Sequence, residues 1–415
     1  MAVASSKNGV SSILTAGVIV AALGYFVDIY DLLLFGVVRK DSLSSMGYSP
    51  AEIEKYGLML LNVQMIGMLI GGIFWGMLGD KKGRLSVLFG SIVIYSIANI
   101  GNGFVNDVTQ YAILRFIAGF GLAGELGAGI TLVSESLPTE KRGYGTMIVA
   151  AVGVSGAVFA GIISRTIGNW RACYFLGGAL GLALLILRVS VYESGLFKDM
   201  LQKPVQRGNF FMLFRSRAIF LKYLRCILIG LPTWFAIGIL VFFSPEFARK
   251  DLLNIDGKVV AGDAIMYSYA GITLGNVLCS WLSQYLHSRR QAVFWFLILT
   301  AIGFVLYFTA YGRSVTYFYI AMVITGIGTG FWAVIITNAA EQFGTNIRST
   351  VATTVPNLIR GSLNVITPIY AALQAYFNKL VSAEILAVVI IVIPLVALYY
   401  TQETFTKDLN YIEEI

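Results

Sequence analysis

Apolar runs of about 20 residues recur along the whole chain, and they restrict its fold more than any other feature. Inside lipid, such a run must satisfy its own backbone hydrogen bonds, which only helices and closed barrels achieve. Barrel strands would alternate over about ten residues, and the sequence has no such segments. Only 13% of the residues are charged, whereas a soluble protein has about a quarter. The sequence therefore predicts an all-α protein that crosses the lipid bilayer many times.

Twelve runs are long enough to span a bilayer, and they form two groups of six. The predicted spans are 13–37, 57–79, 86–105, 109–133, 144–167, 171–189, 219–243, 264–286, 292–310, 315–339, 349–376 and 383–401. A polar stretch separates the two groups. We predict four regions: an N-terminal six-helix half over 1–190, a cytoplasmic linker over 191–218, a C-terminal six-helix half over 219–401 and a cytoplasmic tail over 402–415.

Basic residues are concentrated in the polar connections between the apolar runs. The predicted linker carries several of them: Lys198, Lys203, Arg207, Arg215 and Arg217. Because short basic connections stay on the cytoplasmic side, this distribution predicts that both termini are cytoplasmic. Membrane orientation therefore accounts for the formal net charge of +8, and we expect no nucleic-acid partner.

The residues that most enzymes need are scarce. The single histidine, His287, lies at a helix end, and three cysteines occupy apolar segments without metal-like spacing: Cys173, Cys226 and Cys279. The chain has no GxxxxGK[ST] phosphate loop and cannot assemble a Ser/His/Asp set. We therefore expect no enzyme activity, no metal site and no bound cofactor.

A short polar sequence, GDKKGR, joins the second and third predicted spans. Its glycines, Gly79 and Gly83, permit a tight turn. Asp80 can accept hydrogen bonds at the N-terminus of a neighbouring helix, where a carboxylate is stabilised. Arg84 and the lysines can face the inner leaflet, so the same residues also suit an ordinary positive-inside loop.

GDKKGR at this place resembles the signature loop of the major facilitator superfamily, and other stretches agree. RFIAGFGLAGELGAG (115–129), ESLPTEKRG (135–143) and YESG (192–195) resemble the family's fourth helix, the loop after it and the end of the sixth helix. GNVLCSWLSQYLHSRR (275–290) is similar to a decayed second signature loop, with Gln284 in place of the usual acid. AEQFGTNIRST (340–350) is similar to the loop after the tenth helix.

The resemblance implies a monomeric twelve-helix transporter of small molecules that works by alternating access around a central cavity. It also implies that a set of loop residues controls gating: Gly79, Asp80, Gly83, Arg84, Glu135 and Arg142. Within the superfamily, VDIYDLLLFG and GELG are most similar to bacterial metabolite:proton symporters. Organic-anion and phosphate:proton symporters are near relatives, although phosphate symporters usually have Asp at the position of Glu125. The implied location is the bacterial inner (plasma) membrane.

Five ionisable residues lie well inside the predicted spans, where an ionised side chain costs about 2.5–3.5 kcal/mol or more. They are Asp28, Asp31, Arg115, Glu125 and Arg360. Helical geometry places the two aspartates on one stripe, with Arg115 at the same depth. Three carboxylates against two guanidiniums leave one acid without a basic partner. We hypothesise that the aspartate pair takes up a proton from outside, with Arg115 and Glu125 as further proton-coupling residues.

Arg360 is the predicted substrate anchor, because a guanidinium fork in a dry cavity suits a carboxylate or phosphate. An alternative is that Arg360 forms a gate by pairing with Glu125, which lies at a similar estimated depth. The remaining substrate-binding candidates are polar or aromatic residues within spans: Gln64, Asn338, Asn357, Trp332 and Trp234.

These observations predict a symporter that imports a small polar or anionic metabolite, such as a carboxylate, with the proton as coupling ion. Three alternatives stay open. They are a phosphate:proton symporter, a drug:proton antiporter with a more apolar cavity, and a sensor that binds a ligand without transporting it.

Overall fold

The computed structural model describes residues 14–188, 208–407 and 411–413. Most of the predicted linker, including Lys198, Lys203, Arg207 and the YESG stretch, lies outside these ranges. Within them the chain is helical and holds no named strand; one isolated β-bridge joins Asp256 to Ser314. The all-α prediction is therefore confirmed for the described part of the chain.

The first group of predicted spans is covered by eight α-helices, since two of the paths are broken. They are α1 Ala16–Ser45, α2 Pro50–Lys82, α3 Arg84–Asn102, α4 Val108–Leu122 with α5 Glu125–Ser136, α6 Thr139–Val154 with α7 Gly156–Ile167, and α8 Trp170–Leu187. Three more elements begin the second group: η2 Phe210–Phe214, α10 Arg217–Ile229 and α11 Leu231–Phe235. A π-helix, η3 Ala236–Val241, continues α11.

The rest of the second group follows the predicted order. It consists of α12 Ser244–Phe247, α13 Ala261–Tyr285, α14 Arg289–Phe308, α15 Val315–Thr329 with α16 Trp332–Gln342, α17 Arg348–Gly361 with α18 Leu363–Leu373, and α19 Lys379–Tyr399. Ten helical runs in the described residues are long and apolar enough to cross a membrane. The runs α13 and α17–α18 are not among these ten, although they cover the eighth and eleventh predicted spans.

At several helices, polar caps set where the helix begins. Helix α2 starts seven residues before its predicted span because Ser49 accepts from the Glu52 N–H and Glu52 bonds back to Ser49, which forms a capping box. Asp107 caps α4 through the N–H groups of Thr109 and Gln110, at 2.8 and 2.9 Å. The hydropathy pattern therefore locates each helix but not its ends.

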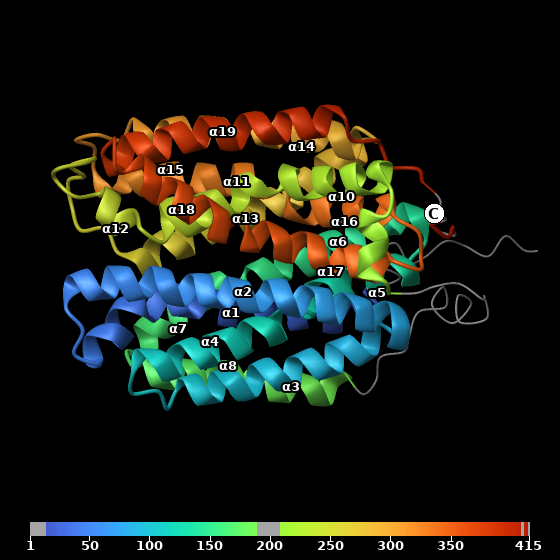
Figure 1. Cartoon of the computed structure of the whole chain (residues 1–415), viewed down its shortest axis with the longest axis horizontal. Coiled ribbons are helices and arrows are strands. Elements are labelled where there is room, and N and C mark those ends of the chain that lie inside the picture. The colour runs from blue at the N-terminus through green and yellow to red at the C-terminus, as the bar shows by residue number, and fades with distance from the viewer. Residues whose placement is uncertain (1–13, 189–207, 408–410, 414–415) are drawn as a thin grey trace, which may run out of the picture.

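In Figure 1, α1–α4, α7 and α8 lie in the lower half of the view and α10–α19 lie mostly in the upper half, while α6 appears between α16 and α17. The two groups meet mainly where α17 packs on α2 and α5, and where α13 packs on α6 and α7. We call the end that carries Gly83 and the last described residues the signature-loop end. The end that carries the loop between α1 and α2 is the opposite end.

Glycines allow α2 and α4 to approach each other closely. A Cβ at Gly67 would lie 2.3 Å from the backbone oxygen of Phe116, and one at Gly119 would lie 2.3 Å from that of Gln64. Membrane helices associate through such close packing, because lipid provides no hydrophobic force between them. The main role of these glycines is therefore to let α2 and α4 pack closely.

Replacing Gly67 with alanine should destabilise the protein by about 1–3 kcal/mol, because the added methyl group meets fixed backbone on α4. Thermal unfolding of the purified protein in detergent should show a lower melting temperature. Gly17→Ala is the control, since its nearest contact would be Thr15 Oγ1 at 3.8 Å. Equal melting temperatures for the two variants would contradict close α2–α4 packing.

Candidate functional site

A break in the fourth helical path places Glu125 inside the protein. Helix α4 ends at Leu122 and α5 begins at Glu125. The Ala123 carbonyl in this break accepts a hydrogen bond from Asn357 Nδ2 of α17, at 2.8 Å. A residue of the second half therefore satisfies a backbone group that the break leaves free in the first half.

Glu125 pairs with Arg188, which the sequence analysis did not select. Arg188 follows α8 and is 1% exposed, and its guanidinium donates to Glu125 Oε1 and to the Leu88 carbonyl. Gly24 leaves room for the pair, since a Cβ there would lie 2.0 Å from Glu125 Oε1. Arg188 lies near the end of the sixth predicted span. With it, three arginines accompany the three carboxylates inside the spans, but Asp31 still has no hydrogen-bond partner in the described residues.

Asp28 and Arg360 face each other across the boundary between the two halves. Arg360 Nη2 lies 4.0 Å from Asp28 Oδ2, and both side chains are buried. The alternative pairing of Arg360 with Glu125 does not occur in this structure, because Glu125 is held by Arg188. The depth estimate failed here because an arginine side chain reaches well over one helical turn from its own Cα.

Aromatic rings enclose the Arg360 guanidinium. Its carbon lies 5.9 Å from the centroid of Trp234 and 5.8 Å from that of Trp332. Trp332 in turn donates a hydrogen bond to Tyr25 Oη, at 3.0 Å. Arg360 also donates to Asn357 Oδ1, at 3.2 Å. The structure thus brings Arg360, Trp234, Trp332 and Asn357 together.

A small cavity lies beside this cluster, between the two halves. Its lining consists of Tyr25, Ile29, Val154, Thr233, Trp234, Ile237, Tyr269, Ile272, Trp332 and Arg360. The cavity measures about 10 Å³, which is barely enough for one water molecule. The central cluster is therefore closed in this structure, and a ligand could enter only if the halves separated.

The sequence predicts that Arg115 and Asp31 lie at a similar depth in the membrane, but the two side chains make no direct contact. No salt bridge within 4.0 Å joins them; instead Arg115 donates to Gln64 Oε1 and lies 4.9 Å from the ring of Phe35. Both carboxylate oxygens of Asp31 are buried without a hydrogen-bond partner in the described part of the chain. Its Oδ1 faces Gly177 of α8, where a Cβ would lie 2.1 Å away. Asp31 therefore faces the interior of the first half.

Three predicted substrate-binding residues, Gln64, Asn338 and Asn357, do not line the central cavity here, and of these only Asn357 contacts Arg360. Gln64 holds Arg115 between α2 and α4. Asn338 accepts hydrogen bonds from Gln342 Nε2 and Thr404 Oγ1, at 3.2 and 2.9 Å. In this conformation Gln64 and Asn338 act as links within one half, which is the more common role of buried amides in membrane helices.

Asp80 caps the N-terminus of α17 across the boundary between the halves. Its carboxylate accepts from the N–H groups of Ser349 and Thr350, at 3.0 and 2.8 Å, and from Thr350 Oγ1 at 2.7 Å. Gly79 permits this approach, since a Cβ there would lie 2.4 Å from Ser349 Oγ. Gly83 has a φ of 95°, which ends α2 and starts α3 in a turn that favours glycine. The predicted contact of Asp80 with a helix N-terminus is confirmed.

A buried network of ion pairs also joins the two halves beside the contact of Asp80 with α17. Arg84 lies 2.8 Å from Glu135, and Glu135 lies 3.3 Å from Arg348 of the second half. Arg142 donates to the Ser134 carbonyl at 2.8 Å. Arg348 was not selected from the sequence, although the spacing from Glu135 to Arg142 recurs from Glu341 to Arg348. That repeat could have identified it.

The second half holds an ion pair that corresponds to Arg84 and Glu135 of the first half. A residue of the C-terminal tail bonds to this pair. Arg289 lies 3.2 Å from Glu341, and Thr404 Oγ1 donates to Glu341 at 2.8 Å. Burial acts to raise the pKa of Glu403, but hydrogen bonds from Ser288 and from the N–H of Arg289 outweigh it, and the pKa is lowered. Glu403 therefore stays ionised where it caps the start of α14.

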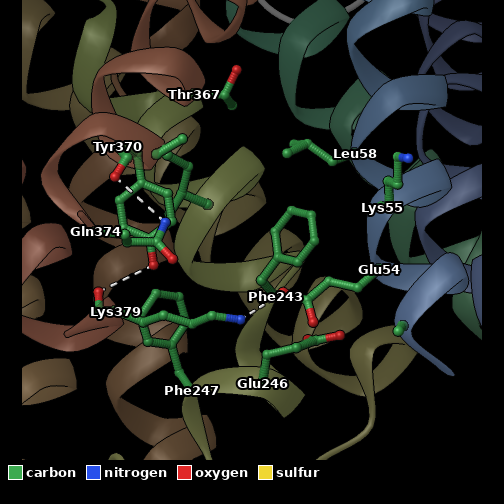
Figure 2. A pocket seen from close by; sticks show the side chains of 13 residues that line it. Glu54, Lys55, Leu58, Phe243, Glu246, Phe247, Thr367, Tyr370, Gln374 and Lys379 are labelled. Atoms are coloured by element: carbon green, nitrogen blue, oxygen red, sulfur yellow. Dashed lines mark hydrogen bonds and ion pairs between the residues drawn. The ribbon is translucent and has the colours of Figure 1, made fainter.

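A larger pocket opens at the opposite end, between α2 and the helices of the second half (Figure 2). It measures about 340 Å³. Two ion pairs join the halves beside it: Lys379 with Glu54 at 2.6 Å, and Arg39 with Glu246 at 3.1 Å. The first pair is partly exposed, with side-chain exposures of 36% and 41%.

Comparisons with known proteins agree with this architecture. A sequence profile of the Major Facilitator Superfamily matches residues 14–368. NiaP of Bacillus subtilis, provisionally named as a niacin/nicotinamide transporter, is 25% identical over 339 residues, covering 80% of this chain and 81% of that protein. The gentisate transporter of Corynebacterium glutamicum is 23% identical over 369 residues, covering 82% and 77%. The 4-hydroxybenzoate transporter PcaK of Pseudomonas putida is 29% identical over 182 residues, covering 40% of each chain.

A solved structure shows the same fold. The proton:xylose symporter XylE, bound to 6-bromo-6-deoxy-D-glucose, matches 96% of this chain and 98% of its own with a TM-score of 0.73. The two sequences are only 16% identical. The likeness therefore concerns the all-helical fold and not the ligand.

Replacing Asp80 with asparagine should loosen the signature-loop end, because the amide nitrogen cannot accept the bonds from α17. The reporter is Thr337→Cys, since Thr337 is 2% exposed and bonds to Thr146 across the halves. Alkylation of this thiol by a polar maleimide should become about tenfold faster.

The control for this experiment is Lys81→Gln, which changes an exposed neighbour of Asp80. The native thiols do not interfere, because all three are buried. An unchanged alkylation rate in Asp80→Asn would show that the contact with α17 does not close this end.

Proposed function

This chain belongs to the major facilitator superfamily, whose members are transporters and not enzymes, and we propose that it imports a small aromatic carboxylate together with protons. The observation that carries the proposal is the buried Arg360 guanidinium, which lies between Trp234 and Trp332 and faces Asp28 across the half boundary. No step changes the substrate chemically, and the proton gradient supplies the energy.

The chemistry of the central cluster supports this substrate class. Arg360 presents a fork of N–H donors that matches a carboxylate, and tryptophan and tyrosine rings offer flat apolar walls for an aromatic ring. Niacin, gentisate and 4-hydroxybenzoate, which occur in the names of the relatives, each combine one ring with one carboxylate. Arg360 can bind the carboxylate while the aromatic side chains that line the cavity contact the ring of the substrate.

Asp28 links the substrate to the proton. A substrate carboxylate that binds Arg360 takes the place of the Asp28 carboxylate, which then lacks its counter-ion inside the membrane. A proton on Asp28 removes that unpaired charge, so substrate and proton bind more favourably together than separately. Asp31 lies on the next turn and can share the proton, so we assign the proton to the pair.

Transport follows by alternating access between two six-helix halves, as a monomer in the inner membrane with both termini cytoplasmic. The closed central cavity supports this view, because a ligand needs the halves to separate on one side. With both termini in the cytoplasm, the signature-loop end faces the cytoplasm. Asp80, Arg84, Glu135 and Arg348 then form the inner gate, and Glu54 with Lys379 belongs to the outer gate.

The alternatives have less support. The fixed basic anchor argues against drug:proton antiport, for which a more apolar cavity was predicted. Phosphate would use Arg360 but not the aromatic walls. A ligand sensor would be an exception among the transporters to which the chain is similar.

Uptake into proteoliposomes tests the proposed function. With an inward proton gradient, nicotinate, gentisate or 4-hydroxybenzoate should accumulate, whereas nicotinamide and phosphate should not. Nicotinamide is the matched control, because it keeps the ring and lacks the carboxylate. Accumulation of phosphate alone, or of no aromatic acid, would overturn the proposal.

Arg360→Lys should raise the KM for the transported acid by about tenfold or more, since lysine keeps the charge but loses the planar fork. Initial uptake rates at several substrate concentrations measure this change. Arg249→Lys is the control, because Arg249 is 57% exposed, pairs within its own loop and does not line the central cavity. An unchanged KM in Arg360→Lys would favour a gating role for this residue.

Asp28→Asn should reduce proton-driven accumulation about tenfold or more, while exchange of substrate across the membrane without a gradient persists. The neutral amide imitates the protonated acid, so the halves can still move but no proton is released. Asp31→Asn should weaken accumulation as well. Full accumulation in both variants would show that the aspartate pair does not couple the proton.

A further inference from the structure

The pocket at the opposite end has the size and lining of a ligand site. Its volume of about 340 Å³ falls within the range of about 300–1,000 Å³ that small-molecule sites occupy. The walls are largely apolar and include Phe243, Phe247, Tyr370 and Leu58. Unlike the central cavity, this pocket is open in the present conformation.

One cation reaches into the pocket. Figure 2 shows the Lys379 side chain crossing toward Glu54, whereas the amine of Lys55 points away from both. The Lys379 backbone is fixed, because its carbonyl accepts a hydrogen bond from Tyr370 Oη at 3.1 Å. Aromatic rings beside one positioned amine repeat the chemistry of the central cluster, where rings surround Arg360.

The bond that Lys379 makes to Glu54 can be exchanged at little cost. Both side chains are more than a third exposed, and such pairs contribute little to stability. A ligand carboxylate can therefore replace Glu54 as the partner of Lys379. Because Glu54 belongs to α2 and Lys379 to α19, this exchange would also break a link between the two halves.

The pocket shares a wall with the central cavity. The π-helix η3 contributes Ile239 to the pocket and Ile237 to the central cavity. π-helical turns are rare and frequently occur at functional sites. A ligand in the pocket would thus lie against η3, which also lines the central cavity.

We propose that this pocket is a second, weaker binding site for the transported aromatic monocarboxylate. Lys379 binds the carboxylate in place of Glu54, and Phe243, Phe247 and Tyr370 surround the ring. Occupation of the pocket releases the Glu54–Lys379 link and so favours opening at this end. The proposal rests on the proposed function for its ligand class, but it concerns different residues.

Equilibrium dialysis of the purified protein with radiolabelled nicotinate and 4-hydroxybenzoate tests the second site. The wild type should bind two molecules per chain, one of them weakly. Arg360→Lys should weaken the tight site about tenfold or more and leave the weak one unchanged, and the double variant Arg360→Lys/Lys379→Gln should lose the weak site as well. Glu54→Gln should tighten the weak site by up to about fivefold, because it removes the competing carboxylate.

Lys55→Gln is the matched control, since it removes a lysine whose amine points away from the pocket centre, and it should leave weak binding unchanged. Melting temperatures of all variants show whether each one is folded. If Arg360→Lys abolishes all binding, or if Lys379→Gln leaves the weak site intact, the second site is refuted while the proposed function stands. If the wild type binds neither acid, both proposals fall.

Discussion

The ion pair between Asp28 and Arg360 is the interaction on which the rest of the structure depends. It is the one buried pair that joins the two halves at the level of the central cavity in the described residues. Neither charge can be left alone in a membrane interior without a cost of several kcal/mol. When the halves separate, each group therefore needs a replacement partner. A substrate carboxylate for Arg360 and a proton for Asp28 are replacements of the required charge.

Two further groups of buried charges lie within the first half, around Glu125 and around Arg115. Glu125 and Arg188 neutralise each other, and Gly24 provides the space for them. Arg115 is fixed by Gln64 and by the ring of Phe35. Asp31 keeps no hydrogen-bond partner in the described residues, whereas Asp28 faces Arg360 of the second half.

The two ends of the molecule are held by interactions of different strength. At the signature-loop end, Arg84, Glu135 and Arg348 are fully buried, and breaking such a network costs about 3–5 kcal/mol. At the opposite end, the Glu54–Lys379 pair is partly exposed and contributes about 1 kcal/mol or less. Of the ion pairs Arg39–Glu246 and Glu54–Lys379, which both join the halves at the opposite end, the second is therefore the one that breaks more easily.

The sequence by itself determined the all-α class, the order and approximate positions of the helices, the turn at Gly83 and the contact of Asp80 with a helix N-terminus. These features follow from hydropathy over about 20 residues and from local turn and capping chemistry. The tertiary structure alone decided the partners: Arg188 for Glu125, Arg360 for Asp28, and Gln64 for Arg115. Depth along a helix fixes only one of three coordinates, and a long arginine side chain extends past its own turn. Which charges meet therefore depends on how the helices rotate and pack, and no single helix records that arrangement.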